Sequence, residues 1–592
     1  MNKEALLKSY WGFDAFKPLQ EQIIDSVLSK KDTFALLPTG GGKSLCYQIP
    51  ALMTEGFVLV ISPLIALMED QVNGLRAIGI KSMYFESTSK SLHLSKQLDN
   101  AIHGKNKIVY VSPERLSNPY FLGQIKRAQI SLIAVDEAHC ISEWGHDFRP
   151  AYRKINVLRE YFPKTPVLAL SASATTEVKK DVVTLLGLKS PSHFTNSFER
   201  PNLVYNVWNT EDKFNTVLQL LNHHKGSSII YCYSRKQTQL LANFINRHQH
   251  RAFYFHGGLL PSEKKQRLKD WQNGTVTHMV ATTAFGMGID KSNVRIVIHL
   301  SPPESMESYY QETGRAGRDG MRAHVFLLYH QGDLVELKKR IFDQFPNEVE
   351  LNGIYKDLCN FFQIAYGEGQ DRTYSLDLEV FCNRYQRSEK KLNQCLVQLE
   401  KTGILSWHAS KNKQLRLQSK SSVESTLQYL KAETTSARVL EYVMRHHPDF
   451  FSDPIRVTIP SICSACKISS DQLLVALRQL EQDNFIEFTG RTATLYLFFH
   501  VPREDKYTLQ PVKKLLKNLK VQKTEKFNAI RAFIQDENKC KRNFLMAYFG
   551  EIFKSNCNQC SSSMCQSNVH RSSDFRSKAI ELLKMKPHSI QE

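Results

Sequence analysis

A glycine-rich segment, residues 38–44, constrains this chain more than any other stretch. Its sequence is Pro38-Thr39-Gly40-Gly41-Gly42-Lys43-Ser44, between an apolar run that predicts a buried strand and a pattern that predicts a helix. Backbone N–H groups at such a turn close on phosphates, with Lys43 reaching the β/γ oxygens and Ser44 ligating Mg²⁺. The usual pattern has a further glycine where this chain has Leu37. On this segment alone, a tight loop that binds no phosphate is therefore the alternative interpretation.

Size and charge narrow the classes of protein. With 592 residues, 42% hydrophobic and 23% charged, the chain predicts several globular domains with real cores. No apolar run reaches the length that crosses a bilayer, so we expect a cytoplasmic protein without a membrane partner, or a nuclear one where there is a nucleus. A formal net charge of +20 favours a nucleic-acid partner, although a merely basic protein is the alternative. Twelve scattered cysteines argue against a secreted disulfide framework.

Apolar strand patterns alternate with helical ones, and polar residues begin where each strand ends. In the first 200 residues these strands cover 33–37, 57–61, 108–111, 132–135 and 167–170. This is typical of a parallel α/β sheet with its working groups at the carboxyl edge. Asp136 and Glu137 follow one strand, where Asp136 would hold Mg²⁺ through water and Glu137 would orient or deprotonate the attacking water. A structural pair of exposed acids is the alternative.

The strand pattern recurs at 228–232, 251–255, 278–282 and 295–299, which predicts a second, similar lobe. Beyond it, Arg315 and Arg318 lie three apart and would share one face of a helical turn, able to grip charge on a γ-phosphate. A solvated basic face is the alternative. We predict a first lobe over 1–200 and a second over 201–345.

These segments resemble a superfamily-two helicase of the Asp-Glu-Ala-His type. Residues 16–20 and the aromatic-rich stretch 140–150 resemble, more narrowly, the RecQ family of DNA helicases. The resemblance implies a 3′-to-5′ DNA helicase that couples ATP hydrolysis to duplex unwinding in repair or recombination. Its partners would be single-stranded and duplex DNA, with single-strand-binding or repair proteins. Residues 197–202 resemble that family's hinge between the lobes.

The resemblance also assigns site residues, with Phe13 and Gln20 at the adenine, Lys17 where an arginine is usual, Asp290 at the ribose, and Gln311 at the phosphate or its water. The full nucleotide set is Phe13, Lys17, Gln20, Thr39, Gly40, Gly41, Gly42, Lys43, Ser44 and Asp290. The catalytic set is Lys43, Asp136, Glu137, Gln311, Arg315 and Arg318. The resemblance places both arginines in the ATP cleft, with Arg318 the better candidate for the arginine finger. DNA contacts would come from Trp144, His146, Phe148 and Arg149, by stacking and phosphate pairing, unless this stretch is a buried aromatic cluster.

The middle of the chain predicts two winged-helix-like units, 346–435 and 436–505. Leu392, Leu396 and Leu399 return as Leu473, Leu477 and Leu480 at a constant offset, each time before a strand. Such units bind DNA or serve as protein contacts. A hairpin over 405–417, with Trp407 near its start, would wedge duplex ends or simply pack. Cys463 and Cys466 have no second pair nearby and predict core positions.

The C-terminal part predicts a basic helix and a metal site over 506–570, then a short tail over 571–592. Seven lysines between 506 and 526 suit phosphate contact or solvation. Four cysteines predict a tetrahedral structural Zn²⁺ site and resemble the RecQ-family zinc module: Cys540, Cys557, Cys560 and Cys565.

The expected fold is therefore α/β, with two tandem RecA-like parallel-sheet lobes, winged-helix-like units and a C-terminal zinc-binding helical module. The expected cofactors are ATP, Mg²⁺ and Zn²⁺. Three alternatives remain for the function: an RNA helicase of the same superfamily, a DNA translocase that does not unwind, and a catalytically silent nucleic-acid-binding scaffold. The intact phosphate loop, acid pair and arginine pair argue against the scaffold.

Overall fold

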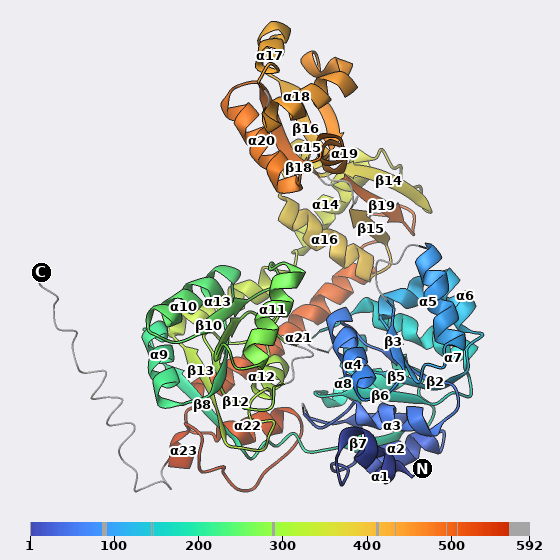
Figure 1. Ribbon diagram of the computed structural model, residues 1–592, viewed down its shortest axis with the longest axis vertical. Coiled ribbons are helices and arrows are strands. Elements are labelled where there is room, and N and C mark those ends of the chain that lie inside the picture. Colours follow the sequence, from blue (N-terminus) through green and yellow to red (C-terminus); the bar gives the residue numbers. More distant parts are fainter. Residues whose placement is uncertain are drawn as a thin grey trace, which may run out of the picture. The chain divides into compact units, whose positions relative to one another are not determined.

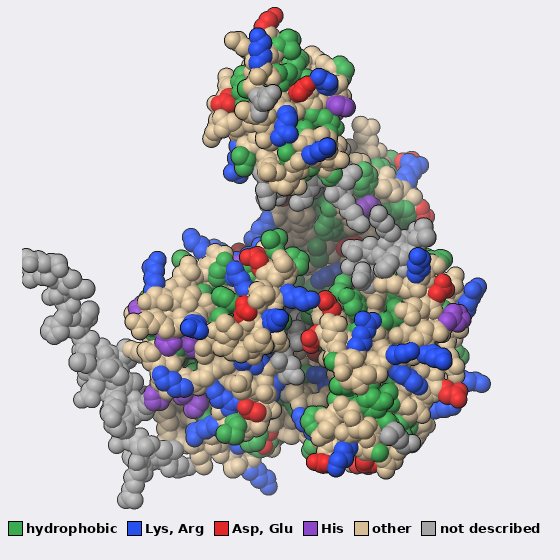
Figure 2. Space-filling view, viewed as in Figure 1, with side chains coloured by type: hydrophobic (Ala, Val, Ile, Leu, Met, Phe, Trp, Pro, Cys, Tyr) green, Lys and Arg blue, Asp and Glu red, His purple; other side chains and the backbone are tan. Residues whose placement is uncertain are grey.

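The computed structural model (Figure 1) forms two units, Met1–Ile341 with Gln522–Glu592, and Phe342–Val521. The structure describes residues 2–38, 40–85, 91–143, 145, 147–286, 291–409, 414–432, 434–492, 494–505 and 507–566. Among these residues no helix combines the length and the apolar character needed to cross a membrane. Lys and Arg side chains are dispersed over the face shown in Figure 2, so the net positive charge is not concentrated in one patch there.

The first lobe holds a parallel sheet whose described strands run in the order β3-β4-β2-β5-β6-β1-β7. Strands β1, β2, β4, β5 and β6 confirm the predicted ones, whereas β3 and β7 were not predicted. The strands are β1 (Thr33–Leu36), β2 (Phe57–Ile61), β3 (Ser82–Tyr84), β4 (Ile108–Val111), β5 (Ile130–Val135), β6 (Val167–Ser171) and β7 (Ser192–Thr195). The helices are α1 (Lys3–Leu6), α2 (Gln20–Leu28), α3 (Leu45–Met53), α4 (Ile65–Ala77), α5 (Ser91–His103), α6 (Pro119–Ile125), α7 (Val157–Tyr161) and α8 (Thr176–Leu185).

The second lobe repeats this design, and its described strands follow the order β10-β11-β9-β12-β13-β8, all parallel. Its strands are β8 (Leu203–Asn209), β9 (Ser227–Tyr231), β10 (Ala252–Phe255), β11 (His278–Ala281), β12 (Val294–His299) and β13 (Ala323–Tyr329). Its helices are α9 (Lys213–His223), α10 (Arg235–Arg247), α11 (Pro261–Gln272), α12 (Met306–Thr313) and α13 (Gln331–Phe342). In both lobes the central strands are largely buried on both faces, and their sequences are accordingly mostly apolar.

The second unit contains two small antiparallel sheets, β14-β19-β15 and β17-β16-β18. Its strands are β14 (Arg372–Asp377), β15 (Leu405–Ala409), β16 (Gln414–Ser419), β17 (Ile455–Thr458), β18 (Ile486–Thr492) and β19 (Thr494–Phe499). Its helices are α14 (Glu348–Phe361), α15 (Leu378–Tyr385), α16 (Glu389–Lys401), α17 (Val423–Tyr429), α18 (Thr435–His446), α19 (Ile459–Cys466) and α20 (Ser470–Gln482). The repeated leucines lie on α16 and α20, which confirms the two predicted helices, and their side chains are buried.

The two subdomains of this unit interleave, which differs from the predicted consecutive units with a boundary near 435. Residues 414–492 form the second sheet and its helices, and they are inserted between β15 and β19 of the first. The physical reason is the alternation in β19, because Leu495, Leu497 and Phe499 complete the core of the first subdomain. The predicted hairpin over 405–417 is accordingly wrong, since β15 pairs with β19 whereas β16 pairs with β17 and β18.

The predicted basic helix is α21 (Gln510–Gln535), and it divides between the two units at Val521. Its first half contributes Val512 and Leu516 to the core of the second unit. Its second half belongs to the first unit, together with α22 (Lys541–Tyr548), α23 (Ser563–Gln566) and the cysteine cluster. Insertion of Phe342–Val521 therefore leaves the C-terminal module folded with the two lobes.

Candidate active site and metal centre

The phosphate loop, residues 38–44, connects β1 to α3, and two upstream side chains hold its backbone. Gln20 Nε2 donates to the carbonyl oxygens of Gly41 and Gly42 at 3.3 and 2.9 Å, and Lys17 Nζ donates to that of Gly40 at 2.9 Å. Gly42 has φ +72°, and a Cβ there would lie 2.3 Å from Gln20 Nε2. Glycine is thus required where the loop turns under Gln20. Lys17 and Gln20 contact the loop, as well as being predicted near the base.

Lys43 and Ser44, also in the predicted nucleotide set, belong to the loop itself. Lys43 and Ser44 are half-buried where α3 begins. Phe13 is 53% exposed, which leaves its ring available for stacking on a base, whereas Phe16 packs against a buried apolar cluster that includes Ile24 and Ile49. Thr39 and Asp290 lie outside the described residues.

The acid pair, Asp136 and Glu137, follows β5 at the carboxyl edge of the first sheet. Glu137 adopts the left-handed backbone conformation, with φ +47°, and its N–H donates to Asp136 Oδ1 at 3.0 Å. Loss of hydration raises the pKa of Asp136 to about 7; the Glu137 charge adds to this and Lys43 opposes it. His139 Nδ1 lies 3.5 Å from Glu137 Oε2 and 2.9 Å from Ser171 Oγ, so it joins the acid pair to the end of β6. Two adjacent carboxyls whose charge is incompletely offset fit a divalent cation such as Mg²⁺.

We expect Asp136→Asn to make the chain more stable at pH 8 but not near pH 4, in buffer without Mg²⁺. The folded state raises the pKa of Asp136 from 3.8 to about 7, so the carboxyl binds its proton more tightly when folded. Its contribution therefore favours folding at low pH and is lost as the pH rises from about 4 to 7. Calorimetry should find the variant's Tm higher than wild type by a few degrees at pH 8. If the difference in Tm between variant and wild type were the same at pH 4 and pH 8, the Asp136 charge would not be destabilising in the folded state.

The two predicted arginines occupy different surroundings. Helix α12 ends at Thr313, so Arg315 and Arg318 lie in the turn that follows, residues 314–319, which we call the arginine turn. The prediction of a shared helical face is therefore wrong; Gly314 stands at the C-cap and Gly317 has φ +56°.

Arg318 is the arginine that reaches the first lobe, because its Cγ lies 3.5 Å from the position of a Cβ on Gly40 of the phosphate loop. Arg315 is only 6% exposed, hydrogen-bonds Tyr231 and lies against Gly286 within its own lobe. Gln311 is half-buried on the last turn of α12. The structure thus brings Arg318, rather than both arginines, onto the loop.

Side chains of the aromatic-rich loop, residues 140–150, contact other residues of the first lobe. Arg149 pairs with Asp147 at 3.1 Å and donates at 2.8 Å to the carbonyl of Pro63, two residues after the end of β2. The Phe148 ring lies 5.2 Å from the Arg153 guanidinium. Trp144 and His146, predicted to contact DNA, lie outside the described residues.

A lysine of α21 approaches the same loop. Lys526 Nζ donates to the Gly145 carbonyl at 3.3 Å and pairs with Glu307 of α12 at 3.2 Å. This lysine of the predicted basic helix is only 12% exposed, so it serves an internal ion pair rather than solvation.

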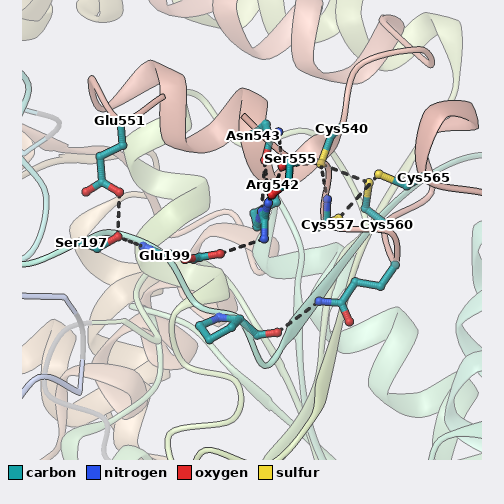
Figure 3. A network of polar contacts seen from close by, with 12 residues as sticks. Ser197, Glu199, Cys540, Arg542, Asn543, Glu551, Ser555, Cys557, Cys560 and Cys565 are labelled. Carbon is teal, nitrogen blue, oxygen red and sulfur yellow. Dashed lines mark hydrogen bonds and ion pairs between the residues drawn. The ribbon is translucent and has the colours of Figure 1, made fainter. Parts of the chain in front are cut away.

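The four C-terminal cysteines converge as predicted (Figure 3). Their sulfur atoms all lie within 4.8 Å of one another, with Cys557 and Cys565 at 3.8 Å and Cys540 and Cys560 at 4.0 Å. A tetrahedral Zn²⁺ with bonds of about 2.3 Å separates its sulfurs by about 3.8 Å, so the cluster fits that ion. Side-chain hydrogen bonds within the cluster lower the pKa of the Cys560 thiol and raise the pKa of the Cys557 thiol, so Cys560 is the sulfur that these contacts favour as a thiolate.

Three family models match this chain in the order of its parts. The DEAD/DEAH box helicase model covers residues 17–182, and the helicase conserved C-terminal domain model covers 212–320. The RecQ zinc-binding model covers 506–566 and includes all four cysteines. A curated relative, the probable ATP-dependent DNA helicase RecS of Bacillus subtilis, is 44% identical over 339 residues, which are 57% of this chain and 68% of that protein. The chain belongs to the RecQ family.

Other RecQ relatives are matched over a smaller share of their length. The RecQ helicase of Pasteurella multocida is 43% identical over 57% of this chain and 54% of its own. That of Bacillus subtilis is 41% identical over 62% of each. The matched region thus spans between about half and two thirds of the length of these relatives.

Sequence reasoning missed how this RecQ zinc module docks. Glu551 accepts from Ser197 Oγ at 2.7 Å and from the Phe198 N–H at 2.8 Å, and Arg542 pairs with Glu199 at 2.8 Å. The rings of Phe198 and Phe549 stack with centroids 4.5 Å apart. The available signals in residues 197–202 were one aromatic residue, Phe198, and the adjacent charged residues Glu199 and Arg200. These signals do not identify the segment that contacts them. The module therefore docks on residues 197–202, the segment that resembles the hinge of the family.

Proposed function

We propose that this chain is an ATP-dependent DNA helicase that moves 3′ to 5′ and serves repair or recombination. The observation that carries the proposal is the contact of Arg318, from the second lobe, with Gly40 in the phosphate loop of the first. An ATP site divided between two lobes couples nucleotide binding and hydrolysis to closing and opening of the pair. RecQ-family membership supports DNA as the substrate, and the polarity follows from the family resemblance.

The site residues divide the work of phosphoryl transfer. Lys43 binds the β- and γ-phosphates, and Arg318 stabilises the charge that develops on the γ-phosphate. Glu137 orients the attacking water, and the Glu137 carboxylate is itself held by His139, which contacts Ser171. Ser44 and Asp136 would hold Mg²⁺, which when bound neutralises phosphate charge.

DNA would be gripped by the aromatic-rich loop through stacking and phosphate contacts. Phe148 and Arg149 belong to this group, together with Trp144 and His146 of the predicted set. Such contacts tolerate any sequence, because every base has a stacking face. If the two lobes bind the DNA strand alternately, each ATP cycle would produce one directional step. Single-strand-binding or repair proteins would bind the separated strands.

The test is ATP-dependent unwinding of 3′-tailed, 5′-tailed and blunt DNA duplexes, with a 3′-tailed RNA duplex alongside. We expect only the 3′-tailed DNA to open, and Lys43→Ala to abolish opening and hydrolysis while retaining DNA binding. DNA-stimulated hydrolysis without opening would favour a translocase, and opening of the RNA duplex would favour an RNA helicase. A wild-type chain that hydrolyses no ATP would refute the proposal.

A further inference from the structure

The hinge segment, residues 197–202, is bonded on both of its sides. On the side of the second lobe, the Arg200 guanidinium donates to the carbonyl oxygens of Gly314, Ala316 and Gly317, at 3.3, 2.9 and 3.0 Å. Asn202 Nδ2 also donates to Gly317, at 2.8 Å. These carbonyls belong to the arginine turn, so one hinge side chain holds the backbone on which Arg315 and Arg318 are mounted.

The other side of the hinge is held by the zinc module (Figure 3). The Glu199 carboxylate, next to Arg200 in sequence, pairs with Arg542, whose guanidinium also donates to the Ser555 carbonyl at 2.8 Å. Arg542 lies two residues after Cys540, and Gln559, next to Cys560, donates to the Pro201 carbonyl at 3.1 Å. Residues that contact the hinge are therefore interleaved with the metal-binding cysteines.

The arginine turn needs such support because it lies beyond the end of α12. The last carbonyls of a helix have no partner within it, and those of the turn depend on outside donors. Charge-assisted hydrogen bonds from a guanidinium are the strong kind, and its planar fork can fix several acceptors at once. Arg318 extends from this turn to the phosphate loop, so a displacement of the turn moves its guanidinium directly.

We propose that Arg200 is a positioning residue for the arginine finger: it fixes the arginine turn, while the zinc module holds the hinge through Glu199 and Phe198. This inference rests on the proposed function, because it assigns Arg200 a role in ATP hydrolysis. Arg200 itself contacts carbonyls of the turn. Arg200 acts on the γ-phosphate only through Arg318. We therefore expect it to stabilise chiefly the transition state of hydrolysis and to change the binding of ATP much less.

The experiment compares the full chain with Arg200→Gln, Arg200→Lys and the control Arg247→Gln, which replaces an exposed arginine on α10 of the same lobe. Arg200→Gln should lower kcat for DNA-stimulated ATP hydrolysis by about 10- to 100-fold, the scale of a misplaced catalytic group. The KM for ATP should change less than threefold. Arg200→Lys should recover part of the rate, because an ammonium reaches fewer of the three carbonyls. Arg247→Gln should match wild type.

A second readout separates positioning from folding. Affinity for ADP with aluminium fluoride, which mimics the transferring phosphate, should fall with kcat in Arg200→Gln, while affinity for a non-hydrolysable ATP analogue and the Tm stay near wild type. Glu199→Gln keeps Arg200 but weakens the contact of residue 199 with Arg542. It should lower kcat and the affinity for ADP with aluminium fluoride by about threefold, and it keeps the test informative if Arg200→Gln does not fold.

Three outcomes would overturn the proposal. Wild-type kcat in Arg200→Gln is the first, and equal loss of affinity for both nucleotide analogues is the second. A wild-type chain without DNA-stimulated hydrolysis is the third, and it would overturn the proposed function as well.

Discussion

Arg318→Ala is expected to lower kcat for DNA-stimulated ATP hydrolysis by about 10³-fold, the lower end of what an arginine finger contributes. The stem of Arg318 lies against Gly40 of the phosphate loop, so its guanidinium is delivered to the site from the second lobe. Because the charge that it stabilises develops only as the γ-phosphate is transferred, the KM for ATP should stay within about threefold of wild type. Steady-state hydrolysis with saturating single-stranded DNA gives both constants.

Arg322→Ala is the matched control, since it removes an exposed arginine four residues further along the same segment. It should keep the wild-type kcat. Arg318→Lys should recover little, because an ammonium lacks the planar fork that grips phosphate oxygens. A loss confined to KM, or a variant as active as wild type, would show that Arg318 does not act in phosphoryl transfer.

Arg315→Ala should behave differently, although the sequence analysis places both arginines in the catalytic set. Arg315 is buried against Tyr231 and Gly286, so its loss removes a buried hydrogen bond within the second lobe. We expect a lower Tm along with lower activity, measured on the same samples. A variant with wild-type Tm and a selective loss of kcat would place Arg315 in the ATP cleft after all.

The lobes were predictable because their sheets are parallel and buried on both faces. A strand such as β2 is apolar at every position, and polar residues begin where it ends. This signal is local, so it survives without knowledge of the rest of the fold. The short β7 pairs beside β1 but alternates between half-buried and exposed residues, and no continuous apolar run marks it.

The interleaved subdomains could not be read from local patterns. The sequence identifies α16 and α20 through their repeated leucines, but β19 pairs with β15 across the whole inserted segment 414–492. Strand patterns carry no information about a partner at that separation. The hairpin over 405–417 was a reasonable prediction because neighbours in sequence usually pair.

The candidate site shows the same division between local and distant information. The phosphate loop, the acid pair and the cysteine cluster are each set by short segments, and the structure forms each of them. The docking of the zinc module on residues 197–202 depends on contacts between positions some 350 residues apart, such as Ser197 and Glu551. Each partner alone is an ordinary polar side chain, so only the fold reveals the pair.

Removal of the metal should disable the enzyme through the hinge rather than through the ATP site. Wild type should carry one Zn²⁺ per chain by elemental analysis, and Cys560→Ser should carry close to none, because three thiols do not complete the tetrahedral set. Apparent Zn²⁺ binding free energies in zinc fingers, about 10–16 kcal/mol, match or exceed the net stability of a domain, so residues 540–565 should lose their fold. The contacts of Arg542 and Glu551 with the hinge would go with it, and DNA-stimulated kcat should fall at least about tenfold.

Cys463→Ser is the control for this prediction. Cys463 and Cys466 on α19 have the same spacing as Cys557 and Cys560, but they belong to no group of three or more potential metal ligands among the described residues. That variant should keep one Zn²⁺ and wild-type hydrolysis. Cys560→Ser should still bind a non-hydrolysable ATP analogue, since the phosphate loop and acid pair belong to the first lobe. A zinc-free variant that hydrolyses ATP normally would separate the metal from the hinge, whereas one that also fails to bind the analogue would mean that the module supports the whole fold and not the hinge in particular.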